Sequence, residues 1–144
     1  MSKFYVPTRY DVNDATAGKW FDIVDEAGNN YGEFKLKLLD PSSQRNQADI
    51  NRLKIKYRAK SKTMSEEDSA TAVLCELALV DWKLPTDPAD KDAEAVPYSV
   101  ADGMEYFNLN DFTRWVRSEL FRIATDITYF APEMAEVAEE VEKN

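Results

Sequence analysis

Apolar residues are most concentrated between Ala70 and Leu84, in a nearly uninterrupted run that ends at Pro85. Two stripes at helical spacing follow this run: Val73, Leu77, Val80 and Leu84 form the first, and Leu74, Ala78 and Trp82 form the second. An apolar surface this wide is typical of a helix that is covered on more than one side. Because Ser65 and the acidic residues after it form a good amino-terminal cap, the pattern predicts a central helix over residues 66–84.

The region before this helix predicts a β-hairpin. Residues 31–38 alternate polar and apolar side chains, which places Phe34, Leu36 and Leu38 on one face. Residues 25–30 have the composition of a turn, and residues 20–24 predict the partner strand. We therefore expect a hairpin over residues 20–38. Since a lone hairpin is marginally stable in water, its apolar face must rest on helices.

Three further helices are predicted, over about residues 44–59, 100–107 and 111–127. Residues 1–18 are polar with scattered aromatic side chains, and we expect them to form a flexible amino-terminal arm. The predicted fold class is α+β, mainly α-helical. A single globular domain over residues 19–130 would contain the amino-terminal hairpin, packed on a bundle of about four to five helices.

Residues 131–144 predict an acidic, amphipathic helix at the end of the chain. Its narrow apolar stripe consists of Met134, Val137, Ala138 and Val141, and five glutamates cover its other faces. Such a helix packs on its own domain, lies in a groove of a partner, or pairs with a neighbouring copy of the chain. The stripe residues are therefore our candidates for partner binding, with a homo-oligomer as one possible result.

Charge narrows the classes of partner. The chain has 27 acidic and 18 basic residues and a net charge of −9, which disfavours general binding to nucleic acid or to anionic membranes. The local exception is the segment Arg45–Lys62, where many basic residues are opposed by Asp49 alone. We expect neither an export signal nor a membrane anchor, and a reducing cytoplasm is the simplest compartment for a chain with one cysteine.

The types of residue present argue against catalysis. The chain has no histidine, so the commonest general base and the histidine-paired nucleophiles are missing. Cys75 lies inside the apolar run and is expected to be a small buried hydrophobe. The acidic loop over residues 87–94 lacks the ligand order of an EF-hand, and none of the four glycines fits a phosphate-binding loop. We therefore expect no enzyme activity, no metal and no cofactor.

The most specific motif is Val80-Asp81-Trp82-Lys83-Leu84, followed after an acidic loop by Val96-Pro97-Tyr98-Ser99-Val100-Ala101-Asp102-Gly103-Met104. These stretches resemble the tail assembly chaperones of long-tailed phages and prophages. In that family an aspartate-tryptophan-like signature ends one helix, and a Pro-Tyr/Phe-Ser segment opens the next. Asp81, Trp82, Pro97 and Tyr98 match this signature. Their expected role is structural: Trp82 would anchor the loop, and Pro97-Tyr98 would determine where the next helix begins.

The resemblance covers residues 20–130 in outline and residues 80–104 closely, although the acidic loop is longer here and lacks the usual glycine. It implies a protein without catalytic residues that binds the tape measure protein, a long and partly apolar helical chain, and keeps it soluble. Such a chaperone also recruits tail tube subunits, works in the host cytoplasm and is absent from the mature virion.

Two other classes of function remain open from the residues. One is an adaptor or regulator that binds a host protein through its acidic surface. The other is a small RNA-binding protein that uses Arg45–Lys62.

Overall fold

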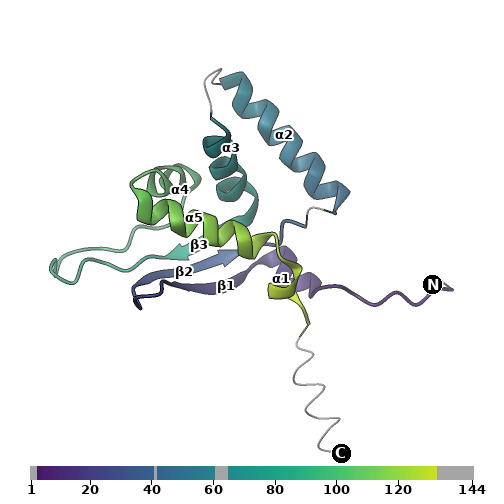
Figure 1. Cartoon of the computed structure of the whole chain (residues 1–144), viewed down its shortest axis with the longest axis horizontal. Helices are drawn as coiled ribbons and strands as arrows, with labels where there is room; N and C mark the ends of the chain where they lie inside the picture. The colour runs from purple at the N-terminus through teal and green to yellow at the C-terminus, as the bar shows by residue number, and fades with distance from the viewer. Residues whose placement is uncertain (1–2, 41, 61–64, 133–144) are drawn as a thin grey trace, which may run out of the picture.

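The computed structural model describes residues 3–40, 42–60 and 65–132, which form an α+β fold that is mainly helical, as predicted (Figure 1). The elements in chain order are α1 (Val12–Ala17), β1 (Lys19–Val24), β2 (Asn30–Leu36), α2 (Gln44–Lys60), α3 (Glu66–Val73), the π-helical turn η1 (Leu74–Ala78), β3 (Leu79–Lys83), α4 (Val100–Phe107), α5 (Asp111–Ala124) and the 3-10 turn η2 (Ile127–Phe130). The hairpin and the helices expected at 44–59 and 100–107 are confirmed. The helix expected over 111–127 ends at Ala124.

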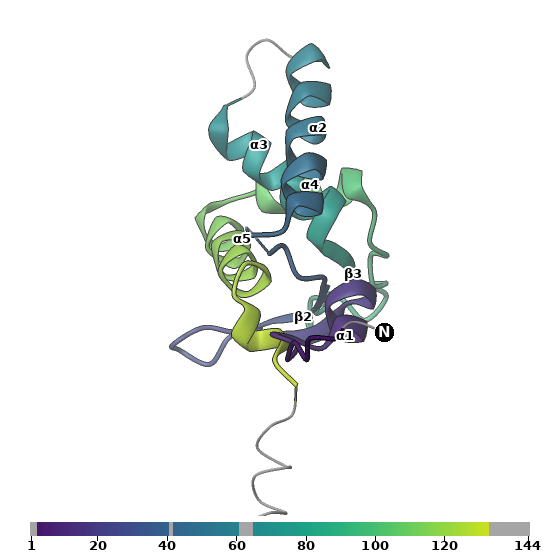
Figure 2. The ribbon, with the colours of Figure 1, turned by 90° about the vertical axis from the view of Figure 1, so that its right-hand side faces the viewer.

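The sheet has the strand order β1-β2-β3, and both strand pairs are antiparallel. Phe34 lies in the middle of the inner face, paired with Phe21 on one side and with Trp82 on the other. Phe34 is completely buried. The helices α4 and α5 lie over one face of the sheet (Figures 1 and 2). The opposite face carries Lys83, whose ammonium lies 4.6 Å from the ring centre of Trp20. One face of the sheet therefore forms the core and the other meets solvent.

The central helix predicted over residues 66–84 is wrong in its second half. α3 ends at Val73, η1 adds one π-helical turn, and the chain then continues directly as β3. Leu79 and Trp82 are buried, whereas Val80 is exposed. The ladder between β3 and β2 uses backbone groups that a two-stranded hairpin would leave unpaired at its edge. The run looked helical because the two buried residues of β3, Leu79 and Trp82, are three positions apart, as on one face of a helix.

We expected residues 1–18 to form a flexible arm, and this prediction is wrong for Val12–Ala17, which form the helix α1. Asp11 accepts a hydrogen bond from the Asp14 amide and begins the helix, and Gly18, at φ 101°, ends it. The Asp11 amide donates to the carbonyl oxygen of Phe130 over 2.7 Å. α1 is thus attached to the body of the protein. A helix of six residues is too short to give a recognisable period.

The segment that leaves β2 joins several distant parts of the chain. The amide of Lys37 donates a hydrogen bond to the carbonyl oxygen of Ala78 over 2.8 Å. The amide of Leu38 donates to the carbonyl oxygen of Ala15 over 3.1 Å, and the amide of Leu39 donates to that of Ala124 over 2.7 Å. Three consecutive amides therefore connect η1, α1 and α5. α2 and α3 extend together away from this body, as both views show (Figures 1 and 2).

Candidate functional site

Trp82, the central residue of the sequence motif, lies in a cluster of aromatic rings beneath α4. Its side chain is 4% exposed, and its indole N–H donates to the carbonyl oxygen of Val96 over 2.8 Å. The rings of Tyr98 and Tyr106 meet it edge-on, with centroids 5.0 and 5.4 Å away. Aromatic pairs favour this geometry. One buried side chain thus ties the end of β3 to the far end of the acidic loop.

Tyr98 connects this cluster to η1. Its hydroxyl donates to the carbonyl oxygen of Cys75 over 2.5 Å. Gly103 allows α4 to lie close to η1, because a Cβ atom at this position would be only 2.9 Å from the Cys75 sulfur. Burial raises the pKa of the Cys75 thiol to about 12, so the thiol stays protonated at neutral pH. Cys75 therefore acts as a packed side chain, and a nucleophilic role would require the thiolate.

The other motif residues lie at the surface. Asp81 is exposed on β3, and its carboxylate accepts a hydrogen bond from the Trp82 amide over 2.8 Å. Pro97 is exposed immediately before Tyr98, and Ser99 caps α4 by accepting from the Asp102 amide. The structure thus brings Trp82 and Tyr98 together and leaves Asp81 and Pro97 outside their contact. The candidate partner-binding residues at the end of the chain lie outside the described residues: Met134, Val137, Ala138 and Val141.

A groove that the sequence analysis missed lies between α2, α3 and α5, and we call it the interhelical groove. Its volume is about 500 Å³, and it is lined by Ile50, Lys54, Glu66, Ser69, Ala70, Val73 and Phe121. Ser69 and Ala70 are small, which leaves room between α3 and the neighbouring helices. In the sequence, Ile50 gave a partial signal because it lies on the apolar face of the predicted helix. The walls of the groove come from α2, α3 and α5, and no local sequence pattern predicts that these three helices lie together.

Polar contacts hold the walls of this groove in place. Arg117 of α5 is 8% exposed, and its guanidinium donates to the Thr71 hydroxyl over 3.0 Å. Tyr57 of α2 donates to the carboxylate of Glu76 over 2.5 Å, and Lys56 pairs with the same carboxylate at 3.6 Å. Burial, reinforced by the bond to Glu76, raises the pKa of Tyr57 to about 12. These bonds fix α5 on α3 and α2 on η1.

Within the described ranges of the chain, no three His, Cys, Asp or Glu side chains are grouped so as to hold a metal ion. The helices in those ranges include none that is both long and apolar enough to cross a membrane. The interhelical groove offers apolar surface, and the exposed charges of Lys54 and Glu66 are part of its lining. Such a surface is suited to holding a ligand by contact.

Comparison with known proteins gives no relative: no protein-family model, no curated protein and no solved structure matches this chain.

Proposed function

We propose that this protein is a phage tail assembly chaperone that binds the tape measure protein, keeps it soluble and recruits tail tube subunits. It acts by contact, without catalysis, in the host cytoplasm, and it leaves before the virion is complete. The proposal rests on the motif over residues 80–104 and on the interhelical groove, which supplies a surface of the required chemistry.

The interhelical groove is the observation that carries this proposal. Apolar grooves between helices bind amphipathic helices by burying side chains at positions i, i+3 or i+4, and i+7. Complete burial of a Leu or Phe side chain contributes about 1.5–3 kcal/mol, so two such residues would contribute about 3–6 kcal/mol before the cost of association. Binding of this strength is reversible, as a chaperone that must release its client requires.

Charge supports the same role. A chain with a net charge of −9 repels other copies of itself, and a complex that carries this charge is kept dispersed while apolar segments of the client are covered. Lys54 and Glu66 contribute one charge of each sign to the lining of the groove, where polar side chains of a client helix would lie.

Co-expression of the full chain with the tape measure protein of the same phage genome tests the proposal. Ile50 is half-buried in the groove wall, and Ile50→Glu places a charge where the client's apolar side chains would lie. We expect at least about tenfold weaker binding, because apolar contact is lost and a charge is desolvated. The client should then appear in the insoluble fraction. Ala70→Glu, on the opposite wall, should have the same effect.

Ile55→Glu is the matched control. Ile55 is on the same helix, is 68% exposed and does not line the groove. The substitution has the same chemistry and the same change of charge, so it should leave client solubility unaltered. Thermal unfolding of each variant confirms that it folds. A client that stays equally soluble with all three variants would show that the groove does not hold it.

A further inference from the structure

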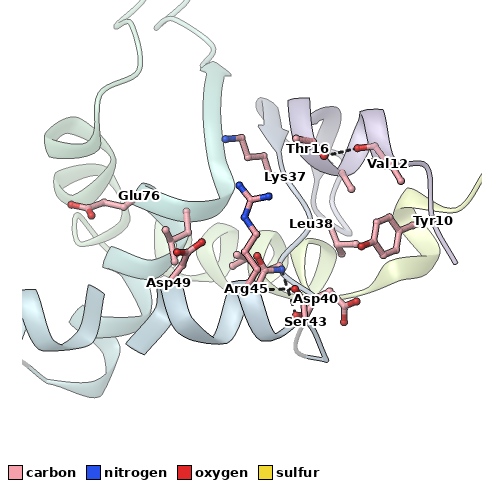
Figure 3. A pocket seen from close by; sticks show the side chains of 14 residues that line it. Tyr10, Val12, Thr16, Lys37, Leu38, Asp40, Ser43, Arg45, Asp49 and Glu76 are labelled. Carbon is pink, nitrogen blue, oxygen red and sulfur yellow. Dashed lines mark hydrogen bonds between the residues drawn. The ribbon is translucent and has the colours of Figure 1, made fainter. Parts of the chain in front are cut away.

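A second pocket lies between α1, residues 37–40 and the first two turns of α2 (Figure 3). Its volume is about 360 Å³, and it shares no lining residue with the interhelical groove. Buried Leu38 and Leu39 contribute apolar surface, and Tyr10 and Val12 contribute a further wall from the α1 side. We call it the cationic pocket, because of the charges of Lys37 and Arg45.

The carboxylates of this pocket already have partners. Each is paired with a cation that does not line the pocket: Arg9 with Asp40 at 3.7 Å, Arg52 with Asp49 at 3.4 Å and Lys56 with Glu76 at 3.6 Å. Asp40 also accepts hydrogen bonds from Ser42, which hold the pKa of this carboxyl below its usual value. The acidic groups around the pocket are therefore compensated from outside it.

The two cations of the pocket have no such compensation. Figure 3 shows the side chains of Lys37 and Arg45 extending into the space between α1 and α2. Neither forms an ion pair with any of the residues that the structure describes. A guanidinium can bind a carboxylate through two parallel hydrogen bonds, and an ammonium offers three donors. The pocket thus presents two unpaired positive charges beside the apolar side chains of Leu38 and Leu39, on a chain whose overall charge is negative.

We propose that the cationic pocket binds the chain's own glutamate-rich segment, residues 133–144, whose carboxylates pair with Lys37 and Arg45 while its methylene groups rest on Leu38 and Leu39. This segment contains five glutamates. It follows η2, where the Phe130 carbonyl oxygen accepts a hydrogen bond from the amide of Asp11, the residue next to Tyr10 in the pocket wall. This inference does not depend on what the interhelical groove binds.

Fluorescence anisotropy of a labelled peptide with the sequence of residues 133–144, titrated with the full-length chain, tests the pocket. The double variant Lys37→Ser/Arg45→Ser should bind the peptide about tenfold more weakly, since it loses two charge-assisted contacts. Lys3→Ser/Lys91→Ser removes the same charge from exposed positions outside both the cationic pocket and the interhelical groove, and should bind like the wild type. Affinity should fall as salt is added.

A third variant tests whether the chain's own segment occupies the pocket. Changing the five glutamates of residues 133–144 to glutamine in the full-length chain removes competition from that segment. We expect this variant to bind the peptide several-fold more tightly than the wild type. Equal affinities would show that another chain supplies any acidic segment, and would overturn the proposal. Equal binding by the pocket variant and its control overturns it as well, as does the absence of binding to all forms at low salt.

Discussion

Replacing Tyr98 with phenylalanine removes one hydroxyl and keeps the ring that packs edge-on against Trp82. The hydroxyl donates to the Cys75 carbonyl oxygen in η1, near the point where the helical backbone ends. Carbonyl groups in the last turn of a helix lack helical partners and need another donor. Cys75 is 1% exposed, so water has little access to take the place of the hydroxyl.

The size of the effect follows from this geometry. Leaving a buried acceptor without its donor costs about 1–3 kcal/mol, and the retained ring keeps the apolar contacts. We expect Tyr98→Phe to lower the free energy of unfolding by about 2 kcal/mol. Domains are typically stable by only about 5–15 kcal/mol, so this loss would reduce the ratio of folded to unfolded molecules about 30-fold.

Urea unfolding followed by tryptophan fluorescence measures this loss, which should move the midpoint down by about 1 M. Tyr5→Phe is the control, because Tyr5 is 89% exposed and its hydroxyl should matter by less than about 0.5 kcal/mol. Equal midpoints for the two variants would refute the assignment of Tyr98 as the residue that stabilises the end of η1.

Three further outcomes are expected from the same region. Gly32 has a φ of 112°, and a Cβ atom there would clash with the Lys83 carbonyl oxygen, so Gly32→Ala should cost at least about 2 kcal/mol in urea unfolding. Gly103→Ala should lower the melting temperature, because overpacking against the Cys75 sulfur costs about 1–3 kcal/mol and helix propensity gains about 1 kcal/mol. Adding Cys75→Ala to this variant should recover part of the lost melting temperature. Burial raises the pKa values of Cys75, to about 12, and of Tyr98. Both groups keep their protons longer in the folded state, so stability is complete below about pH 9 and falls toward pH 12; unfolding at pH 8 and 10.5 measures the slope, which Tyr98→Phe should reduce.

Elements with local signals were predictable from the sequence. Ser99 caps α4, and the helix occupies the residues 100–107 that its spacing predicts. Asn110 and Thr113 exchange the two hydrogen bonds of a capping box and begin α5. A cap involves residues that are close in sequence, so its chemistry is visible without the fold.

The candidate sites were harder to predict from the sequence, because they depend on contacts between distant segments. The motif predicted that Trp82 matters for the loop, but its bond to the Val96 carbonyl and its contact with Tyr106 require the fold of β3 under α4. The interhelical groove depends on Ala70 facing Ile50 across an open space, and neither residue is unusual by itself. The cationic pocket depends on two cations that lie in the segment after β2 and in α2.

The change from helix to strand at Leu79 connects the motif to the interhelical groove. In a continued helix, Trp82 would lie one turn beyond Ala78 on the same stripe, buried as it is now, so burial alone does not decide between the two forms. The pairing of β3 with β2 decides it, because a helix would leave the edge of β2 unpaired. As a result, α3, η1 and β3 form one continuous unit, with a groove wall at one end and the Trp82 cluster at the other. The interhelical groove and the Trp82 cluster are therefore built on one uninterrupted stretch of backbone, residues 66–83.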